Sequence, residues 1–267
     1  GFDVLHIDPS VSPNGAPEEE LAFEYLFELF DHCNDVACRL DKDIAYEVGT
    51  EEQDTVAESP QKLEKWLNRV KDYSSEKGLE APLFVVVQTG TKVMEMRNVG
   101  SLGSPFRVPN QLPSSIGLPR IVDIAHRCGF MIKQHNTDYL SDAVLSRHPE
   151  MKIDAANVAP EFGVVESKAL VYFCEAHGLL AERDEFLEMA YNSRKWEKWM
   201  LNGTVATDRE KALICGHYIF SSEEYQDLLQ RARRQADKKG NELEGFLLNA
   251  VSAAIERYIK NFRLVTP

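Results

Sequence analysis

The sequence predicts an α/β protein of the (β/α)8-barrel (TIM-barrel) type, of which this chain carries about five βα units, plus a C-terminal helical extension. Five apolar segments of strand length alternate with amphipathic helices up to about residue 180, and only helical patterns follow. Each strand also ends in polar residues capable of chemistry, which is typical of the C-terminal face of a barrel. We therefore expect residues 1–180 to form five-eighths of a barrel and residues 181–267 to form a helical extension packed on it.

The five expected strands each combine an apolar body with a polar end. They cover residues 2–8, 44–49, 82–88, 130–135 and 152–158. The segment PLFVVVQ at 82–88 is almost continuously apolar, as parallel strands covered on both faces are. No glycine-rich phosphate loop follows any of these strands, which weakens the case for a nucleotide-binding doubly wound sheet.

The expected helices follow local start and stop signals. Ser59 with Pro60 is typical of a helix start, and Gly78 ends the same helix after Lys77. The other helices are expected at residues 18–40, 120–128, 140–147, 162–177, 183–201, 208–219, 222–239 and 242–261. The stretch 89–119 is rich in glycine and proline, so we expect an irregular functional loop or lid there.

The composition excludes some classes of partner. The net charge of −13 argues against nucleic acid and anionic membranes. We find no apolar run of membrane-spanning length and no signal peptide. The five cysteines are scattered and odd in number, which favours free thiols in a reducing cytoplasm. We therefore expect a cytoplasmic protein that binds neither nucleic acid nor membrane.

Polar side chains at the strand ends are the candidate functional residues. In chain order they are Asp8, Glu51, Gln88, His135 with Asp138, and Asn157 with Glu161. Each residue also has a plain structural explanation, because Asp8 before Pro9 fits a turn cap, Glu51 fits a solvated loop and His135 fits a hydrogen-bonded core histidine. The ordered set favours one shared site, since the ends of parallel strands converge.

The strand-end sequences resemble a known family. HIDPS, VGTEE, VVVQTG, QHNTDY and NVAPEF, in this order and at these separations, resemble the Z-type (non-catalytic) subunits of class II tagatose-bisphosphate aldolase and related sugar epimerases. The similarity runs from about Val4 into the C-terminal helices. It implies that these strands are the fourth to eighth of a (β/α)8 barrel and that the first three are missing. We expect truncation of a longer protein, with a completing polypeptide or an incomplete barrel as alternatives.

The resemblance implies a metal-dependent enzyme that acts on a ketose, ketose (bis)phosphate or keto sugar acid. Enediolate chemistry would lead to epimerisation or retro-aldol cleavage. We expect a divalent metal, zinc or manganese, at His135 and Glu51, with Asp8 and Glu51 as the carboxylates that move the proton. The expected substrate-binding residues are Gln88, Asp138, Asn157, Arg97 and Arg107, with Lys92 and Lys133 as further candidates for an anionic group.

Two other functions compete with this hypothesis. The chain could be a non-catalytic subunit that stabilises a separate aldolase, because Gln88 stands where a third metal-binding imidazole would be expected. It could also be a sugar-binding or structural barrel without turnover. The expected partners are a sugar or sugar phosphate, a catalytic aldolase subunit under the first alternative, and further copies of this chain in a homo-oligomer.

Overall fold

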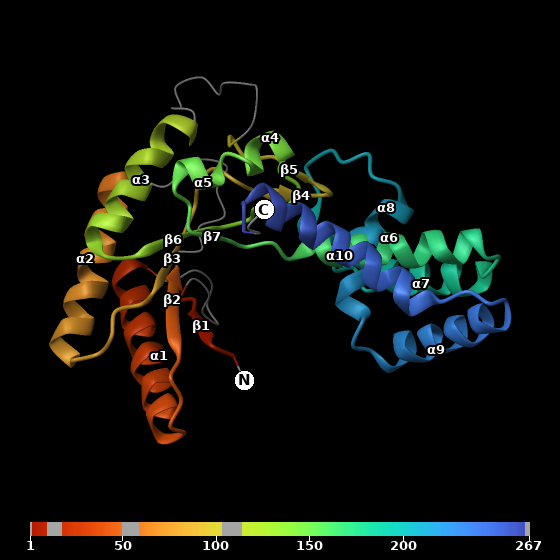
Figure 1. The fold of residues 1–267 in the computed structure, drawn as a ribbon, viewed down its shortest axis with the longest axis horizontal. Helices are drawn as coiled ribbons and strands as arrows, with labels where there is room; N and C mark the ends of the chain where they lie inside the picture. The colour runs from red at the N-terminus through yellow and green to blue at the C-terminus, as the bar shows by residue number, and fades with distance from the viewer. Residues whose placement is uncertain (1, 10–17, 50–58, 103–113, 265–267) are drawn as a thin grey trace. The chain divides into compact units, whose positions relative to one another are not determined.

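Parallel strands and helices alternate through the first part of the chain, as the sequence predicts, and helices fill most of the remainder (Figure 1). The computed structural model describes residues 2–9, 18–49, 59–102 and 114–264. Two units are distinguished: unit 1 holds residues 1–92, 99–137 and 147–157, and unit 2 holds residues 93–98, 138–146 and 158–267. The predicted domain boundary near residue 180 stays a prediction.

Unit 1 is built on a parallel sheet. Its strands are β1 (Val4–Ile7), β2 (Ala45–Gly49), β3 (Phe84–Val87), β6 (Met131–Gln134) and β7 (Ala155–Ala156). They are paired in the order β1-β2-β3-β6-β7, which is also the order in which these five strands occur in the chain. The predicted α/β class is therefore confirmed. All five strands are shorter than predicted, because only the residues with ladder hydrogen bonds on a neighbouring strand belong to the sheet.

One face of this sheet is covered by helices. The helices of unit 1 are α1 (Glu19–Arg39), α2 (Pro60–Lys77), α3 (Ser114–Cys128) and the short α5 (His148–Met151). Figure 1 shows α1, α2 and α3 on the same side of the strands. Tyr46 of β2 meets Phe30 of α1 edge-on, with ring centroids 5.1 Å apart. The opposite face is more open, since Val4 is 38% and Met131 39% exposed.

The structure corrects the prediction of a continuous irregular stretch at 89–119. Val93–Met94 (β4) and Arg97–Asn98 (β5) form a small antiparallel pair of strands, which belongs to unit 2. The helix α3 starts at Ser114 and passes through Pro119. It does so because a buried apolar stripe, Leu118, Ile121, Val122 and Ala125, continues on both sides of the proline. Residues 103–113 lie outside the described part of the chain.

A second correction concerns the residues after β6. The predicted helix at 140–147 is only one turn, α4 (Asp142–Leu145), and a further turn follows as α5. Pro149 lies in the first turn of α5. Proline is tolerated there because the first backbone N–H groups of a helix have no intrahelical partner.

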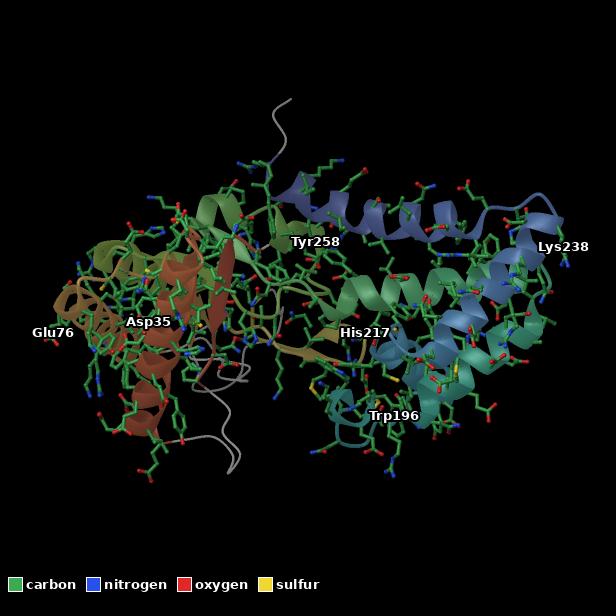
Figure 2. The ribbon with its side chains drawn as sticks, turned by 90° about the horizontal axis from the view of Figure 1, so that it is seen from below. Asp35, Glu76, Trp196, His217, Lys238 and Tyr258 are labelled. Atoms are coloured by element: carbon green, nitrogen blue, oxygen red, sulfur yellow. The ribbon has the colours of Figure 1, made fainter. Side chains whose placement is uncertain are left out.

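Unit 2 is mainly helical, and its helices lie largely within the predicted helical segments. They are α4, α6 (Pro160–Ala176), α7 (Leu180–Asn192), η1 (Glu197–Trp199), α8 (Asp208–Cys215), η2 (Gly216–Ile219), α9 (Glu223–Lys238) and α10 (Leu243–Asn261). Trp196, labelled in Figure 2, stacks on Tyr191 with ring centroids 5.5 Å apart. Within the described residues, no helix is both long enough and apolar enough to cross a bilayer.

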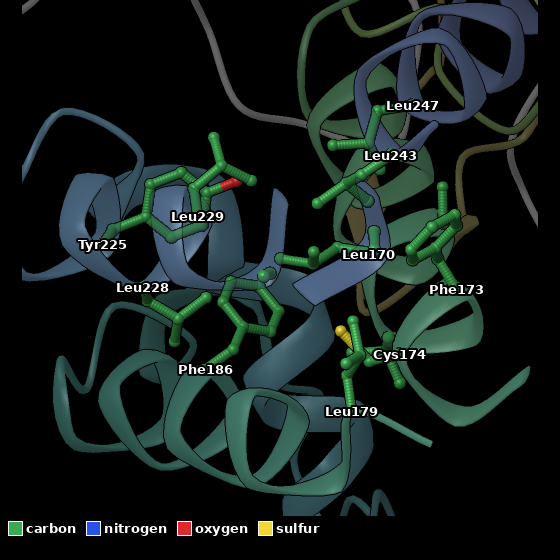
Figure 3. Packing of buried hydrophobic residues seen from close by; sticks show 14 of the residues in the cluster. Leu170, Phe173, Cys174, Leu179, Phe186, Tyr225, Leu228, Leu229, Leu243 and Leu247 are labelled. Atoms are coloured by element: carbon green, nitrogen blue, oxygen red, sulfur yellow. The ribbon is translucent and has the colours of Figure 1, made fainter. Parts of the chain in front are cut away.

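The core of unit 2 lies among α6, α7, α9 and α10 (Figure 3). Leu170, Phe186 and Leu228 have no exposed surface, and Tyr225 is 2% exposed. Phe186 and Tyr225 lie with their ring centroids 5.9 Å apart. Full burial of each such apolar side chain stabilises the fold by about 1.5–3 kcal/mol. This core accounts for the apolar stripes seen in the sequence of the C-terminal third.

Helix starts in unit 2 are set by local capping. The Thr207 side chain accepts a hydrogen bond from the backbone N–H of Glu210 at 3.2 Å, and the Glu210 carboxylate accepts one from the backbone N–H of Thr207 at 2.7 Å. Ser222 caps α9 in the same way, accepting from the N–H of Tyr225. Such caps are local in sequence, which explains why α8 and α9 begin within a residue of the predicted positions.

Candidate functional site

The candidate site is the edge of the unit 1 sheet where the parallel strands end. Asp8 follows β1, Gln88 follows β3, His135 follows β6 and Asn157 follows β7. Because all strands run in the same direction, their C-terminal ends meet at this edge, where α/β proteins bind their ligands. Four of the predicted site residues are thereby brought to one edge. The predicted residues Glu51 and Arg107 lie outside the described residues.

A buried hydrogen-bond network fixes the end of β6. The Gln134 amide nitrogen donates to Thr89 Oγ1 at 2.7 Å, and the Gln134 oxygen accepts from Thr137 Oγ1 at 2.9 Å and from His148 Nε2 at 2.7 Å. Gln134, Thr89 and Thr137 have no exposed surface, and His148 is 2% exposed. Buried polar groups are costly unless they are paired. This network therefore holds the backbone on either side of His135 in one arrangement.

Gln88 uses its side-chain oxygen to fold the loop that follows β3. Its Oε1 accepts hydrogen bonds from the backbone N–H groups of Gly90, at 2.8 Å, and Thr91, at 2.9 Å. The turn places Gly90 at φ 83°, a left-handed conformation that favours glycine. The Thr91 hydroxyl then donates to the carbonyl oxygen of His135. The side-chain oxygen of Gln88 therefore has its partners within its own loop.

His135 and Asp8 differ in exposure at this edge. His135 is 8% exposed, and its backbone N–H donates to the carbonyl oxygen of Val87 at 3.1 Å. Asp8 is exposed. Among the described residues, no three His, Cys, Asp or Glu side chains gather as metal ligands would. The described residues therefore do not make up a metal centre by themselves, and the prediction of zinc or manganese at His135 and Glu51 stays a prediction.

Asp138, predicted to bind substrate, belongs to unit 2 and caps α6. Its Oδ1 accepts hydrogen bonds from the backbone N–H groups of Ala159, at 3.0 Å, and Glu161, at 2.9 Å. Ala159 at the N-cap position has no side-chain acceptor, so Asp138 supplies one from elsewhere in the chain. Burial raises the pKa of Asp138 to about 6, although the two backbone hydrogen bonds act in the opposite direction.

Glu161 connects the segment after Asp138 to α10, also within unit 2. Its Oε2 accepts from the backbone N–H of Tyr139 at 2.6 Å and from the Tyr258 hydroxyl. Its Oε1 lies 3.3 Å from Arg257 Nη1, and Arg257 also donates to the carbonyl oxygen of Leu140. Sequence reasoning missed Tyr258 and Arg257. No local pattern relates them to Glu161, which lies about a hundred positions earlier in the chain.

The remaining predicted residues have separate surroundings. Arg97 lies in β5 of unit 2, where its guanidinium forms an exposed ion pair with Glu95 at 3.1 Å. Asn157 continues the pairing beyond β7, since its N–H donates to the carbonyl oxygen of Gln134 and its own carbonyl accepts from Thr137, both at 2.9 Å. The unit 1 candidates are thus Asp8, Gln88, His135 and Asn157, whereas Asp138 and Arg97 belong to unit 2.

A charged cluster lies on the open face of the sheet; the sequence named Lys133 as a candidate for an anionic group but missed its partners, Glu47 and His6. Glu47, in the middle of β2, is 5% exposed. Its Oε1 lies 2.7 Å from His6 Nδ1, and Lys133 Nζ lies 2.9 Å from Oε1 and 2.8 Å from Oε2. Burial acts to raise the pKa of Glu47, but hydrogen bonds from His6 and Lys133 and their charges outweigh it and hold the pKa below its usual value. The available signal was a charged or imidazole side chain within each of three mainly apolar strands.

The fold and the site define an α/β protein with a parallel sheet whose strand ends carry polar side chains. No family model matches the chain, and no curated protein matches it. Among solved structures, it is similar to a probable tagatose 6 phosphate kinase from Sinorhizobium meliloti, with a TM-score of 0.73 and 15% identity over 98% of this chain and 73% of the other.

A second similar structure is the glycerol-complexed fructuronate-tagaturonate epimerase UxaE from Cohnella laeviribosi. The TM-score is 0.59 and the identity 9%, over 91% of this chain and 50% of the epimerase chain. This chain therefore spans about half the length of that epimerase. At these identities the likeness shows a common fold.

Proposed function

We propose that this protein is a carbohydrate enzyme that acts on a ketose, ketose (bis)phosphate or keto sugar acid through an enediolate. The reaction would be an epimerisation or a retro-aldol cleavage. The observation that carries the proposal is the edge of the parallel sheet at which Asp8, Gln88, His135 and Asn157 follow four strands. Similarity of fold to a sugar epimerase supports the same class of chemistry.

We further propose that the five strands are the fourth to eighth of a (β/α)8 barrel. The sequential order of five parallel strands, with helices on one face, supports this interpretation. A barrel would place the strand ends around one pocket. It would also enclose the open face that carries His6, Glu47 and Lys133.

In this scheme Asp8 and Glu51 are the carboxylates that move the substrate proton. Gln88 and Asn157 hold sugar hydroxyl groups. The further substrate-binding candidates are Asp138, Arg97 and Arg107. Glu51→Gln is the direct test: we expect loss of turnover with sugar binding retained, because the amide keeps the shape but cannot accept the proton. Turnover at the wild-type rate would remove Glu51 from the scheme.

A divalent metal, zinc or manganese, remains part of the proposal, with His135 and Glu51 as its ligands. A bound metal would polarise a substrate carbonyl as a Lewis acid. The test is elemental analysis of the protein after dialysis, with the wild type beside His135→Ala. About one equivalent of metal in the wild type, lost in the variant, would support the site. Equal metal content in both proteins would exclude His135 as a ligand.

The alternative proposal is a non-catalytic subunit that stabilises a class II tagatose-bisphosphate aldolase. It is favoured by the commitment of the Gln88 oxygen to its own loop, which leaves that oxygen less able to hold a substrate hydroxyl group. The test is capture of this protein from its source. A stoichiometric aldolase partner would favour the alternative, whereas turnover by the isolated protein would favour the enzyme.

We also propose a cytoplasmic homo-oligomer. All five cysteines are unpaired, as expected of a reducing compartment. Exposed apolar side chains on unit 2, including Tyr172 at 64% and Leu248 at 64%, support self-association. Light scattering after gel filtration measures the mass directly, and a monomer at micromolar concentration would refute the oligomer.

A further inference from the structure

Tyr139, which follows β6 in the chain and belongs to unit 2, has an unusual backbone conformation. Its φ is 59°, in the left-handed region. Glycine and asparagine adopt this region readily, but a bulky aromatic residue is an outlier there. Such conformations persist only where the surroundings impose them, and they cluster at binding and catalytic sites. The backbone of Tyr139 therefore points to a role beyond packing.

Two helices of unit 2 impose this conformation. The backbone N–H of Tyr139 donates to Glu161 Oε2 of α6 at 2.6 Å. The same carboxylate accepts from the hydroxyl of Tyr258 in α10, which is labelled in Figure 2. On the other side of Tyr139, the carbonyl oxygen of Leu140 accepts from Arg257 of α10. The main chain around Tyr139 is thus held from both sides.

The side-chain hydroxyl of Tyr139 is not held in this way. Its oxygen is buried, and none of the described residues forms a hydrogen bond with it. A buried polar group without a partner costs stability, and buried polar groups in native proteins nearly always have one. The chain therefore fixes the main chain of Tyr139 firmly and leaves its hydroxyl unpaired. This combination is expected of a group whose partner is a ligand.

Two other buried tyrosine hydroxyls lack a partner among the described residues, but their surroundings differ. Tyr46 lies in strand β2 against the ring of Phe30, and Tyr225 lies in helix α9 against the ring of Phe186. Neither has a positive φ. Packing of the aromatic ring explains both positions, whereas Tyr139 combines an unpaired hydroxyl with an imposed left-handed backbone.

The charges near Tyr139 determine which kind of group its hydroxyl can bind. Burial, followed by the carboxylates of Asp138 and Glu161, raises the pKa of the Tyr139 hydroxyl, so the phenol stays protonated and can donate. The same carboxylates would repel a phosphate or carboxylate group. A sugar hydroxyl or keto oxygen is neutral and can accept from the phenol without this repulsion.

We propose that the Tyr139 hydroxyl binds a neutral oxygen of the sugar substrate, with Glu161 as the residue that positions its backbone. This inference rests on the function proposed above. It adds a neutral hydrogen-bond donor next to Asp138, one of the substrate-binding candidates. Because the hydroxyl oxygen is buried, sugar binding favours a conformation in which the sugar can reach it.

The first measurement is the stability of Tyr139→Phe, which removes only the hydroxyl group. The midpoint of urea unfolding should equal or exceed that of the wild type, because no hydrogen bond within the protein is lost. Tyr258→Phe is the matched control: the same atom is removed, but its bond to Glu161 is lost, so the midpoint should fall. A lower midpoint for Tyr139→Phe, or a failure to fold, would show that the hydroxyl has a partner in the protein and would overturn the inference.

The second measurement is calorimetric titration with fructuronate, tagaturonate and tagatose 6-phosphate. For each sugar that the wild type binds, Tyr139→Phe should raise Kd by about 10-fold. Tyr46→Phe is the matched control, since it also removes a buried unpaired hydroxyl, but one that lies against α1 in unit 1; its Kd should be unchanged. Weaker binding of tagatose 6-phosphate beside unchanged binding of the two acids would place the hydroxyl at the phosphate and overturn the assignment to a neutral oxygen.

The third measurement uses the wild type labelled with ¹³C at the Cζ atoms of tyrosine. The Tyr139 signal, identified as the one missing from Tyr139→Phe, should shift when a bound sugar is added, because this carbon carries the hydroxyl group. The Tyr46 signal should stay in place. A Tyr139 signal that does not respond to a sugar bound by the protein would overturn the contact.

The outcomes separate the inference from the proposed function. Sugar binding by the wild type together with an unchanged Kd in Tyr139→Phe would overturn the role of Tyr139 and leave the proposed function intact. A wild type that binds none of the three sugars would overturn both.

Discussion

Gly163, in the first turns of α6, provides a test in which helix propensity and packing predict opposite signs. A Cβ atom built at this position would lie 2.5 Å from the Cβ and 2.6 Å from the Cγ of His217, which is labelled in Figure 2. Ordinary contacts between carbon atoms are about 3.5–4.0 Å. The His217 Cβ is attached directly to the backbone of η2, so it cannot give way by a change of rotamer. We expect Gly163→Ala to destabilise unit 2.

The magnitude follows from two opposing contributions. Alanine in a helix interior is favoured over glycine by about 1 kcal/mol. Forcing an extra methyl group into a packed interface costs about 1–3 kcal/mol. The net expectation is a loss of about 1 kcal/mol in the free energy of unfolding, and up to about 2 kcal/mol if η2 cannot move. Gly117→Ala in α3 is the matched control: no atom lies within 4 Å of its added Cβ, so only the gain of about 1 kcal/mol remains.

The assay is urea unfolding followed by far-ultraviolet circular dichroism, with the transition midpoint compared at constant slope. The two substitutions lie in different units, so each is compared with the transition of its own unit. We expect a lower midpoint for Gly163→Ala and a higher one for Gly117→Ala. A Gly163→Ala protein as stable as the wild type would refute the close approach of His217 to α6.

Three further predictions concern individual groups of unit 2. The pKa of Asp138, about 6 when folded against 3.8 for an ordinary aspartate, means that the folded state keeps a proton between these pH values that the unfolded state has lost. Stability should therefore fall by about 3 kcal/mol as the pH rises from about 3 to 7, and Asp138→Asn should abolish this part of the dependence; an unaltered pH profile of unfolding would contradict it. Tyr258→Phe should lower stability by about 1–3 kcal/mol, because the partly buried Glu161 carboxylate loses a hydrogen bond; Tyr172→Phe, at an exposed position, is the control, and equal melting temperatures for the two variants would exclude the contact. Burial raises the pKa of Cys174 to about 12, so its thiol should resist iodoacetamide at pH 8 while the exposed Cys38 reacts; mass spectrometry of tryptic peptides checks this, and equal labelling would refute the burial of Cys174.

The helices of the C-terminal third were predictable because their signals are local. The capping pair Thr207 and Glu210 marks the start of α8, and Gly78 in a left-handed conformation ends α2 as predicted. The predicted helix at 183–201 starts earlier, at Leu180, and ends as α7 at Asn192, with a separate turn at 197–199. Apolar periodicity does not determine where a helix is interrupted.

The candidate site was predictable in outline and not in its chemistry. Strand direction follows from the alternation of strands and helices, so the sequence alone assigns Asp8, Gln88, His135 and Asn157 to one edge of the sheet. It does not reveal that the Gln88 oxygen is used within its own loop, since this depends on the turn at Gly90. Asp138 shows the same limit, because its partner is the start of a helix about twenty residues later in the chain.

By itself, the sequence determined the α/β class, the five parallel strands and the helices of the second unit, because hydrophobic periodicity and capping act between residues close in the chain. Only the tertiary structure decided which polar groups meet. His6, Glu47 and Lys133 lie on three strands, with 86 positions between Glu47 and Lys133, and Glu161 contacts Tyr258 across 97. The physical reason is that strand register and helix packing set these contacts, and neither leaves a mark in any short stretch of sequence.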